Sequence, residues 1–113
     1  MELIMSEKEF FNELLSNGHV WVIMKDQKVL SLNDTNGNLD LPVWYCKEIA
    51  IEFLSNISAL DSYNPVEIPL EIFKVSWLAE GKMNFNELII NPNGINSKNL
   101  ALTKKEFINR LWH

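Results

Sequence analysis

The sequence is poor in the residues that build disulfides, metal sites and phosphate loops. It contains one cysteine, Cys46, and two histidines, so no internal disulfide can form and the three or four ligands of a zinc site are lacking. Its four glycines stand apart in separate turns, which is not the pattern of a phosphate-binding loop. We therefore expect no metal and no cofactor. A lone cysteine also favours a reducing compartment, so we expect a cytoplasmic protein.

Long apolar runs and clusters of positive charge are missing too. No stretch approaches the ~18 consecutive apolar residues of a membrane helix, and the opening MELIMSEKEFF is acidic where a secretory signal would be basic. The formal net charge is −5, and the basic residues are dispersed apart from a small group at Lys104, Lys105 and Arg110. Because nucleic-acid binding requires a basic patch, we expect neither a nucleic-acid nor a membrane partner.

The sequence does contain enough apolar material for a core. Its 113 residues are 47% hydrophobic and 11% aromatic, which argues against intrinsic disorder and suits one domain spanning residues 1–113. A chain of this length buries about two-thirds of its unfolded surface when it folds. We interpret residues 1–18 as an amino-terminal helix and residues 19–113 as the rest of the same domain.

Two helices are marked by capping boxes. Ser6 and Glu9 open the first helix, and Thr103 and Glu106 open the last. Gly18 is placed to end the first helix in the left-handed conformation. Their expected buried stripes are Phe10, Phe11, Leu14 and Leu15, and Phe107, Ile108 and Leu111.

Two further helices are indicated by apolar periodicity. One begins near Lys47, and the other follows Pro69, which suits the first turn of a helix, and ends at Gly81. Their expected stripes are Ile49, Phe53 and Ile57, flanked by Ala50 and Leu54, and Phe73, Trp77 and Leu78.

Extended segments separate these helices. The run HVWVIMKDQKVLSL predicts a hairpin with a polar tip at Lys25 to Lys28, followed by a turn at Gly37. Leu39 to Val43 is a short strand, and Pro42 places it at a sheet edge or outside the ladder because proline has no amide to donate.

The second half of the chain repeats this pattern. Asn64-Pro65 predicts a break before a brief extended piece at Val66 to Ile68, and FNELIINPNGINSKNLALT predicts a hairpin with a loop at Asn91 to Lys98. Hairpins interleaved with helices predict an α+β fold. We expect a single domain with a mainly antiparallel sheet of about four to six short strands and about four helices packed on it.

Taken together, these segments resemble the bacterial domain of unknown function numbered 2750. The similarity runs from about Trp21 to Leu111 and includes the element Leu-Pro-Val-Trp and the spacing Pro-x-x-Ile-x-Leu-x-x-Phe. The positions that carry it are Trp21, Leu41, Pro42, Val43, Trp44, Glu48, Ala50, Tyr63, Pro65, Ile68, Leu70, Phe73, Trp77 and Leu78. The resemblance implies a small cytoplasmic α+β fold. It carries over no catalytic residue, because the family has no assigned activity.

The candidate binding surface is Trp44, Tyr45 and Cys46, at the junction between the strand and the second helix. Tryptophan and tyrosine are favoured at binding hot spots because they combine apolar area with a polar group. Trp44 has a second interpretation, as an aromatic wedge between packed elements. Cys46 lies near a helix start, which lowers a thiol pKa, but Glu48 opposes a thiolate and His19 is the only credible base.

We assign no catalytic residue. The favoured function is a small non-enzymatic interaction module of a bacterial cytoplasm that binds a protein partner, for example an immunity-like protein that neutralises a basic toxin. The alternative is a small-ligand-binding protein or enzyme with a pocket near Trp44, Cys46 and His19. Monomer and homodimer both stay open as oligomeric states.

Overall fold

Helices and strands alternate along the chain nearly as the sequence predicts. The computed structural model describes residues 7–33, 37–57, 60, 62–79, 84–92 and 100–112. The elements, in chain order, are α1 (Glu7–Asn17), β1 (His19–Lys25), β2 (Lys28–Val29), β3 (Leu32–Asn33), β4 (Leu39–Val43), α2 (Lys47–Ser55), β5 (Asn64–Pro69), α3 (Leu70–Ile72), η2 (Phe73–Leu78), β6 (Glu87–Ile90), β7 (Ala101–Thr103) and α4 (Lys104–Trp112).

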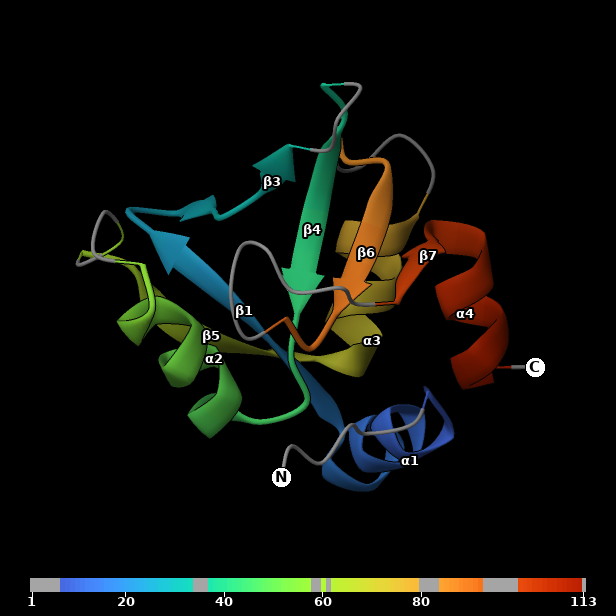
Figure 1. Cartoon of the computed structure of the whole chain (residues 1–113). Helices are drawn as coiled ribbons and strands as arrows, with labels where there is room; N and C mark the ends of the chain where they lie inside the picture. The colour runs from blue at the N-terminus through green and yellow to red at the C-terminus, as the bar shows by residue number, and fades with distance from the viewer. Residues whose placement is uncertain are drawn as a thin grey trace.

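The strands form two sheets (Figure 1). The first has the order β2-β1-β5 and is antiparallel throughout. The second has the order β3-β4-β6-β7, with one parallel pair, β4 and β6, between antiparallel neighbours. The expected α+β fold with a mainly antiparallel arrangement is confirmed. The division into two sheets and the parallel pair were not predicted.

A single backbone bridge joins the two sheets. Trp21 in β1 pairs with Trp44, the residue after β4, in an isolated antiparallel bridge. Successive residues of a strand point to opposite faces, and both faces of β1 are covered. Val20 and Val22 enter one core cluster, whereas Ile23 enters a second cluster beneath α2. Because both faces of β1 are covered, its residues are apolar at consecutive positions rather than only at alternate ones.

The position of β4 corrects the expectation drawn from Pro42. The strand lies inside its sheet, between β3 and β6, rather than at an edge. Its pairing with β3 ends at Asp40, and the Trp21 bridge begins at Trp44, so Pro42 falls between the two neighbours on that side. The missing amide of proline therefore interrupts no ladder hydrogen bond.

The expected break at Asn64-Pro65 is wrong. Both residues belong to β5, which pairs with β1 along its whole length, from Asn64 opposite Met24 to Pro69 opposite His19. Because β5 is an edge strand, it tolerates proline. Pro69 is the last residue of this strand and precedes α3 as its cap residue, instead of lying in the first helical turn.

The helix ends follow the predicted local signals where the structure describes them. Thr103 and Glu106 form the expected capping box of α4, with Glu106 N–H donating to Thr103 Oγ1 at 3.1 Å and Thr103 N–H donating to Glu106 Oε1 at 2.9 Å. Gly18 ends α1 with a φ of 79°, whereas Ser6 lies outside the described residues. The predicted stripe of α1 is wrong at Leu15, which is 50% exposed.

The third helix is unusual because α3 continues as a π-helix, η2. Hydrogen bonds to the fifth preceding residue widen the turn, so residues five apart approach the same side. Phe73 and Leu78 are five apart, and both are buried. Trp77 is half-buried rather than fully in the stripe, and Gly81, the expected stop, lies outside the described residues.

Phenylalanine rings tie three helices together. The ring of Phe107 in α4 lies 5.0 Å from that of Phe11 in α1 and 5.8 Å from that of Phe73 in η2, measured between centroids. These contacts pack α1, η2 and α4 on the larger core cluster. Helix α2 covers the other cluster, on the opposite side of the molecule (Figure 1). No helix in the described ranges combines the length and apolarity needed to cross a bilayer.

Candidate functional site

Trp44 is an internal anchor. Its side chain is 0% exposed, its ring lies 5.2 Å from that of Phe53 in α2, and its Nε1–H donates to the carbonyl oxygen of Pro92 at 2.7 Å. A tryptophan buried with its polar atom satisfied stabilises a fold strongly. Of the two interpretations of Trp44, the wedge between elements matches this geometry, and the indole offers no surface to a partner.

The side chain of Tyr45 is partly exposed at the surface. It is half-buried, its ring meets Phe10 of α1 edge-on at 6.5 Å, and its backbone N–H donates to Oδ1 of Asn91 at 3.2 Å. Asn91 adopts a φ of 53° and donates its own N–H to Val43, so the chain after β6 is fastened to the end of β4 at both positions. Tyr45 is therefore held in place while part of its side chain stays accessible.

The phenol of Tyr45 lies in an acidic environment. Its pKa is raised by burial first, then by the charge and hydrogen bond of Cys46, and then by the carboxylates of Glu13 in α1 and Glu48 in α2. Each of these effects disfavours the phenolate. Two helices thus bring negative charge to one aromatic side chain. We call Tyr45, Cys46, Glu13 and Glu48 together the Tyr45 surface.

Cys46 is a half-buried free thiol at the cap position of α2. Its side chain makes no capping hydrogen bond to the helix and instead contacts Tyr45. The structure thus brings Cys46 together with Tyr45, as their adjacency in the sequence suggests.

His19 interacts with Glu67 and Trp21 and has no hydrogen bond to Cys46 among the described residues. Its Nε2 lies 3.3 Å from Oε2 of Glu67 in β5, and its ring lies edge-on to Trp21 at 5.8 Å between centroids. If the Trp21–Trp44 pairing continued as a ladder, His19 would lie opposite Cys46, but the bridge is isolated. No hydrogen bond joins His19 to Cys46 in the described part of the chain.

Two residues of this region were missed by sequence reasoning. Glu13 was given no role from the sequence, and Asn91 was taken as the first residue of a loop. Neither carries a local signal, because Asn91 bonds to Tyr45 across 46 residues of chain and Glu13 acts on its phenol from another helix. Among the described residues, no group of three or more histidine, cysteine, aspartate or glutamate side chains is placed to hold a metal ion.

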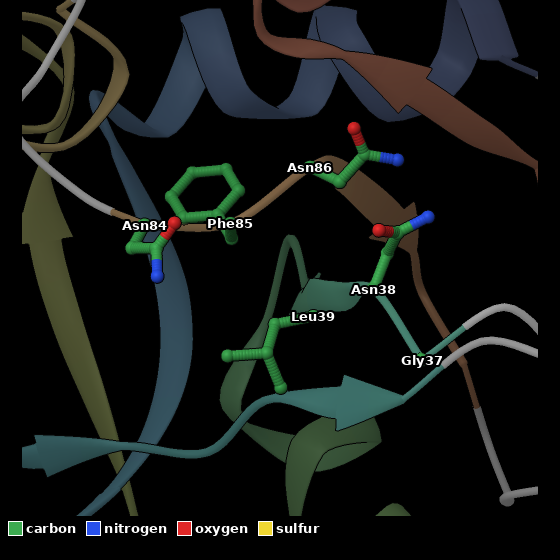
Figure 2. A pocket seen from close by; sticks show the side chains of 6 residues that line it. All are labelled: Gly37, Asn38, Leu39, Asn84, Phe85 and Asn86. Carbon is green, nitrogen blue, oxygen red and sulfur yellow. The ribbon is translucent and has the colours of Figure 1, made fainter.

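A hollow of about 370 Å³ lies at the other end of β4 (Figure 2). It opens between the segment that leads into β4 and the segment that leads into β6. The residues that line it are Gly37, Asn38, Leu39, Asn84, Phe85 and Asn86. None of these six residues was proposed as a site from the sequence, and the hollow is separate from the expected pocket near Trp44 and Cys46.

Comparison with known proteins identifies a family but no activity. A chain titled "Anabaena Tic22 (protein transport)" is similar in structure at 18% sequence identity, with a TM-score of 0.46. The similarity covers 76% of this chain and 46% of that one, so the chain spans about half the length of that protein. No curated protein matches the sequence. The model of the family described as "Protein of unknown function (DUF2750)" matches residues 7–111, which include α1 as well as the region from Trp21 onward, and the chain therefore belongs to this family.

Proposed function

We propose that this protein is a small non-enzymatic interaction module that binds a protein partner through the Tyr45 surface. The observation that supports the proposal is that the carboxylates of Glu13 and Glu48, from two different helices, both act electrostatically on the phenol of the half-buried Tyr45. Within the described residues, neither carboxylate has an ion-pair partner of its own. An aromatic side chain flanked by free negative charge suits a lysine or arginine of a partner.

The charge of the whole chain supports the same kind of partner. A net charge of −5 steers basic proteins toward an acidic surface and accelerates their association. A concrete version is immunity-like action, in which the protein neutralises a basic toxin in a bacterial cytoplasm. On this proposal Trp44 does not touch the partner. Its role is to hold the junction between β4 and α2 rigid beneath Tyr45.

The alternative, a ligand-binding protein or thiol enzyme with a pocket near Trp44 and Cys46, has less support. Trp44 is fully buried, and within the described residues no hydrogen bond joins Cys46 to His19, the base that a thiol mechanism would need. Iodoacetamide labelling of the native protein separates the two. A thiol that reacts faster than free cysteine near neutral pH would favour the enzyme, and slow labelling would favour the binding module.

The test of the binding module compares three baits. The wild type, a Tyr45→Ala/Glu13→Gln/Glu48→Gln variant and a Glu52→Gln control are immobilised, and the proteins that each retains from its own cell extract are quantified by mass spectrometry. Glu52 is an exposed acid of α2 one turn beyond Glu48, and it does not act on Tyr45. We expect a basic protein that the wild type and the control retain and the triple variant loses.

The partner found in this way is then purified for calorimetry. Removing Tyr45 alone should weaken binding about tenfold or more, as expected for an aromatic hot spot. Raising the salt concentration should also weaken it, because exposed charges are screened. Identical retention by all three baits, or binding that is insensitive to Tyr45→Ala, would remove the proposal.

A further inference from the structure

The asparagine-lined hollow beside β4 has fixed walls. Its two sides are the segments that enter the parallel strands β4 and β6, and Asn86 N–H donates to the carbonyl of Leu39 across them at 2.7 Å. One residue further along, Glu87 N–H donates to Oδ1 of Asp40, whose side chain is only 5% exposed. These two bonds hold the walls in register, so the hollow is formed before any ligand arrives.

The lining combines two kinds of side chain. Leu39 and Phe85 supply apolar surface, while Asn38, Asn84 and Asn86 supply carboxamides. In the view of Figure 2, Asn84 lies at one end of the hollow, and Asn38 and Asn86 lie at the other, with Leu39 and Phe85 between them. A ligand that fills this space would contact an apolar surface along its middle and carboxamides at its two ends.

The chemistry of the carboxamides limits what can bind. Each one presents an N–H₂ donor and a carbonyl acceptor side by side. None of the six lining residues that the structure describes ionises, so these side chains carry no charge with which to compensate a charged ligand for lost hydration. The ammonium of Lys104 is near, but it covers the ring of Phe85 at 4.5 Å from the centroid. The best match is a neutral ligand with adjacent donors and acceptors and one apolar face.

We propose that this hollow binds a neutral sugar ring. Each sugar hydroxyl both donates and accepts a hydrogen bond, so neighbouring hydroxyls match a carboxamide, and the C–H face of the ring matches Leu39 and Phe85. The volume of about 370 Å³ is at the small end of the range for ligand sites and suits one ring. This binding is independent of the Tyr45 surface, which lies at the opposite end of β4.

The experiment uses the whole chain labelled with ¹⁵N. Glucose, galactose, mannose and N-acetylglucosamine are titrated while the backbone and side-chain amide signals of Asn38, Asn84 and Asn86 are followed by NMR. We expect saturable shifts of these signals with at least one of the four neutral sugars, at a dissociation constant of about 1 mM, because the lining is largely open. No saturable shift with any of the four sugars would overturn the proposal.

Matched variants test the role of the carboxamides. Asn86→Leu keeps the approximate size of the side chain and removes both its donor and its acceptor, and it should weaken binding by about fivefold or more. Asn109→Ala, at an exposed asparagine of α4 outside the hollow, should leave binding unchanged. Undiminished binding by an Asn38→Ala/Asn84→Ala/Asn86→Ala variant whose spectrum is otherwise native would contradict the proposal.

Charged probes complete the design. Glucuronate and glucosamine carry opposite charges on a similar ring and should bind more weakly than the neutral sugars. If glucuronate binds more tightly, and Lys104→Gln abolishes that preference, the site recognises an anion and the proposal is wrong. Tyr45→Ala should leave sugar binding unchanged. The sugar site and the proposed protein interaction can therefore be tested, and can fail, independently of each other.

Discussion

The backbones of Trp21 and Trp44 hydrogen-bond to each other in both directions. Trp21 N–H donates to Trp44 O at 2.8 Å, and Trp44 N–H donates to Trp21 O at 2.9 Å. This pair connects β1 with the end of β4, and both indoles pack in the core cluster beneath α2. The two sheets are therefore held together at a point where Trp44 is also bonded to Pro92 through its ring nitrogen.

Replacement of Trp44 should destabilise the protein more than replacement of any other tryptophan. Trp44→Phe leaves the carbonyl of Pro92 without its donor and creates a cavity, so the free energy of unfolding should fall by about 1–3 kcal/mol. Trp44→Ala should lower it by about 3–5 kcal/mol. Urea unfolding followed by circular dichroism measures both. The control is Trp112→Phe at a half-buried position, where an equal loss would contradict the assigned role of Trp44.

The phenol of Tyr45 should titrate above the ordinary range for tyrosine. Burial is the largest cause of its raised pKa, and Cys46, Glu13 and Glu48 add to it. Ultraviolet absorbance in a Tyr63→Phe background isolates this phenol, because the chain has two tyrosines. Cys46→Ser and Glu48→Gln should each move the pKa back toward its ordinary value, whereas Glu52→Gln should leave it in place.

The same shift has a consequence for stability in alkali. A phenol whose pKa is higher in the folded chain than in the unfolded chain contributes stability that is complete below the unfolded value and is lost as the pH rises through the folded value. Stability should therefore decline above about pH 10, the ordinary tyrosine pKa. The decline should be smaller in a Tyr45→Phe variant. An equal decline in both proteins would assign the effect to other groups.

The capping box of α4 should respond to acid. The hydrogen bonds from Thr103 lower the pKa of Glu106, and Arg110 adds a smaller effect in the same direction. A carboxyl with a depressed folded-state pKa contributes stability above its unfolded-state pKa, and that contribution is lost as the pH falls through the folded-state value. NMR titration of the Glu106 side chain should show the depressed pKa in the wild type and a value closer to normal in Thr103→Ala.

Thr103→Ala should also weaken α4 itself. Loss of a threonine cap lowers the free energy of unfolding by about 1 kcal/mol. Thr103→Ser retains a hydroxyl that can cap and should recover most of that loss. If Thr103→Ser were as damaging as Thr103→Ala, the hydroxyl would not be the group responsible.

The ion pair between Glu7 and Arg110 should contribute little and should depend on salt. It links the start of α1 to the last turn of α4, and both side chains are more than a third exposed. Exposed pairs contribute about 0.2–1 kcal/mol. Glu7→Gln should therefore lower stability slightly in dilute buffer and by less in concentrated salt. A larger loss that salt does not reduce would indicate a packing role for Glu7.

Gly18→Ala tests the turn between α1 and β1. Gly18 has a φ of 79°, where a side chain is strained, although no atom lies within 4 Å of the position that a Cβ would occupy. The penalty should therefore come from the backbone alone, about 1–2 kcal/mol. Gly18→Asn should be milder, because asparagine tolerates this conformation. Thermal unfolding of the two variants provides the comparison.

Local signals in the sequence predicted local features of the fold well. The capping box at Thr103 and Glu106, the hairpin turn between β1 and β2, and the left-handed Gly18 each depend on residues that are close in the chain. The parallel pairing of Asp40 with Glu87 joins segments that are distant in sequence, and no turn residue specifies it. The π-helix was missed because Phe73, Trp77 and Leu78 also fit an ordinary helical stripe.

The candidate site was predictable only in part. Tyr45 and Cys46 were identified because they are adjacent in the sequence and lie at a strand-to-helix junction. The indole of Trp44 bonds to a carbonyl 48 residues away, and Glu13 acts electrostatically on the phenol of Tyr45 from another helix, so neither could be inferred from local pattern. The hollow between β4 and β6 exists only because those strands are parallel, with their starts at the same end of the sheet.

The two prolines of β5 determine how this edge of the molecule can meet other chains. Leu70 N–H donates to Gly18 O, so the even-numbered residues of β5 face β1 and the odd-numbered residues face away from it. The outward positions are Pro65, Glu67 and Pro69, and only Glu67 has an N–H to donate. A strand from a neighbouring copy would meet one amide and a carboxylate, so this edge resists the intermolecular β-pairing that starts aggregation.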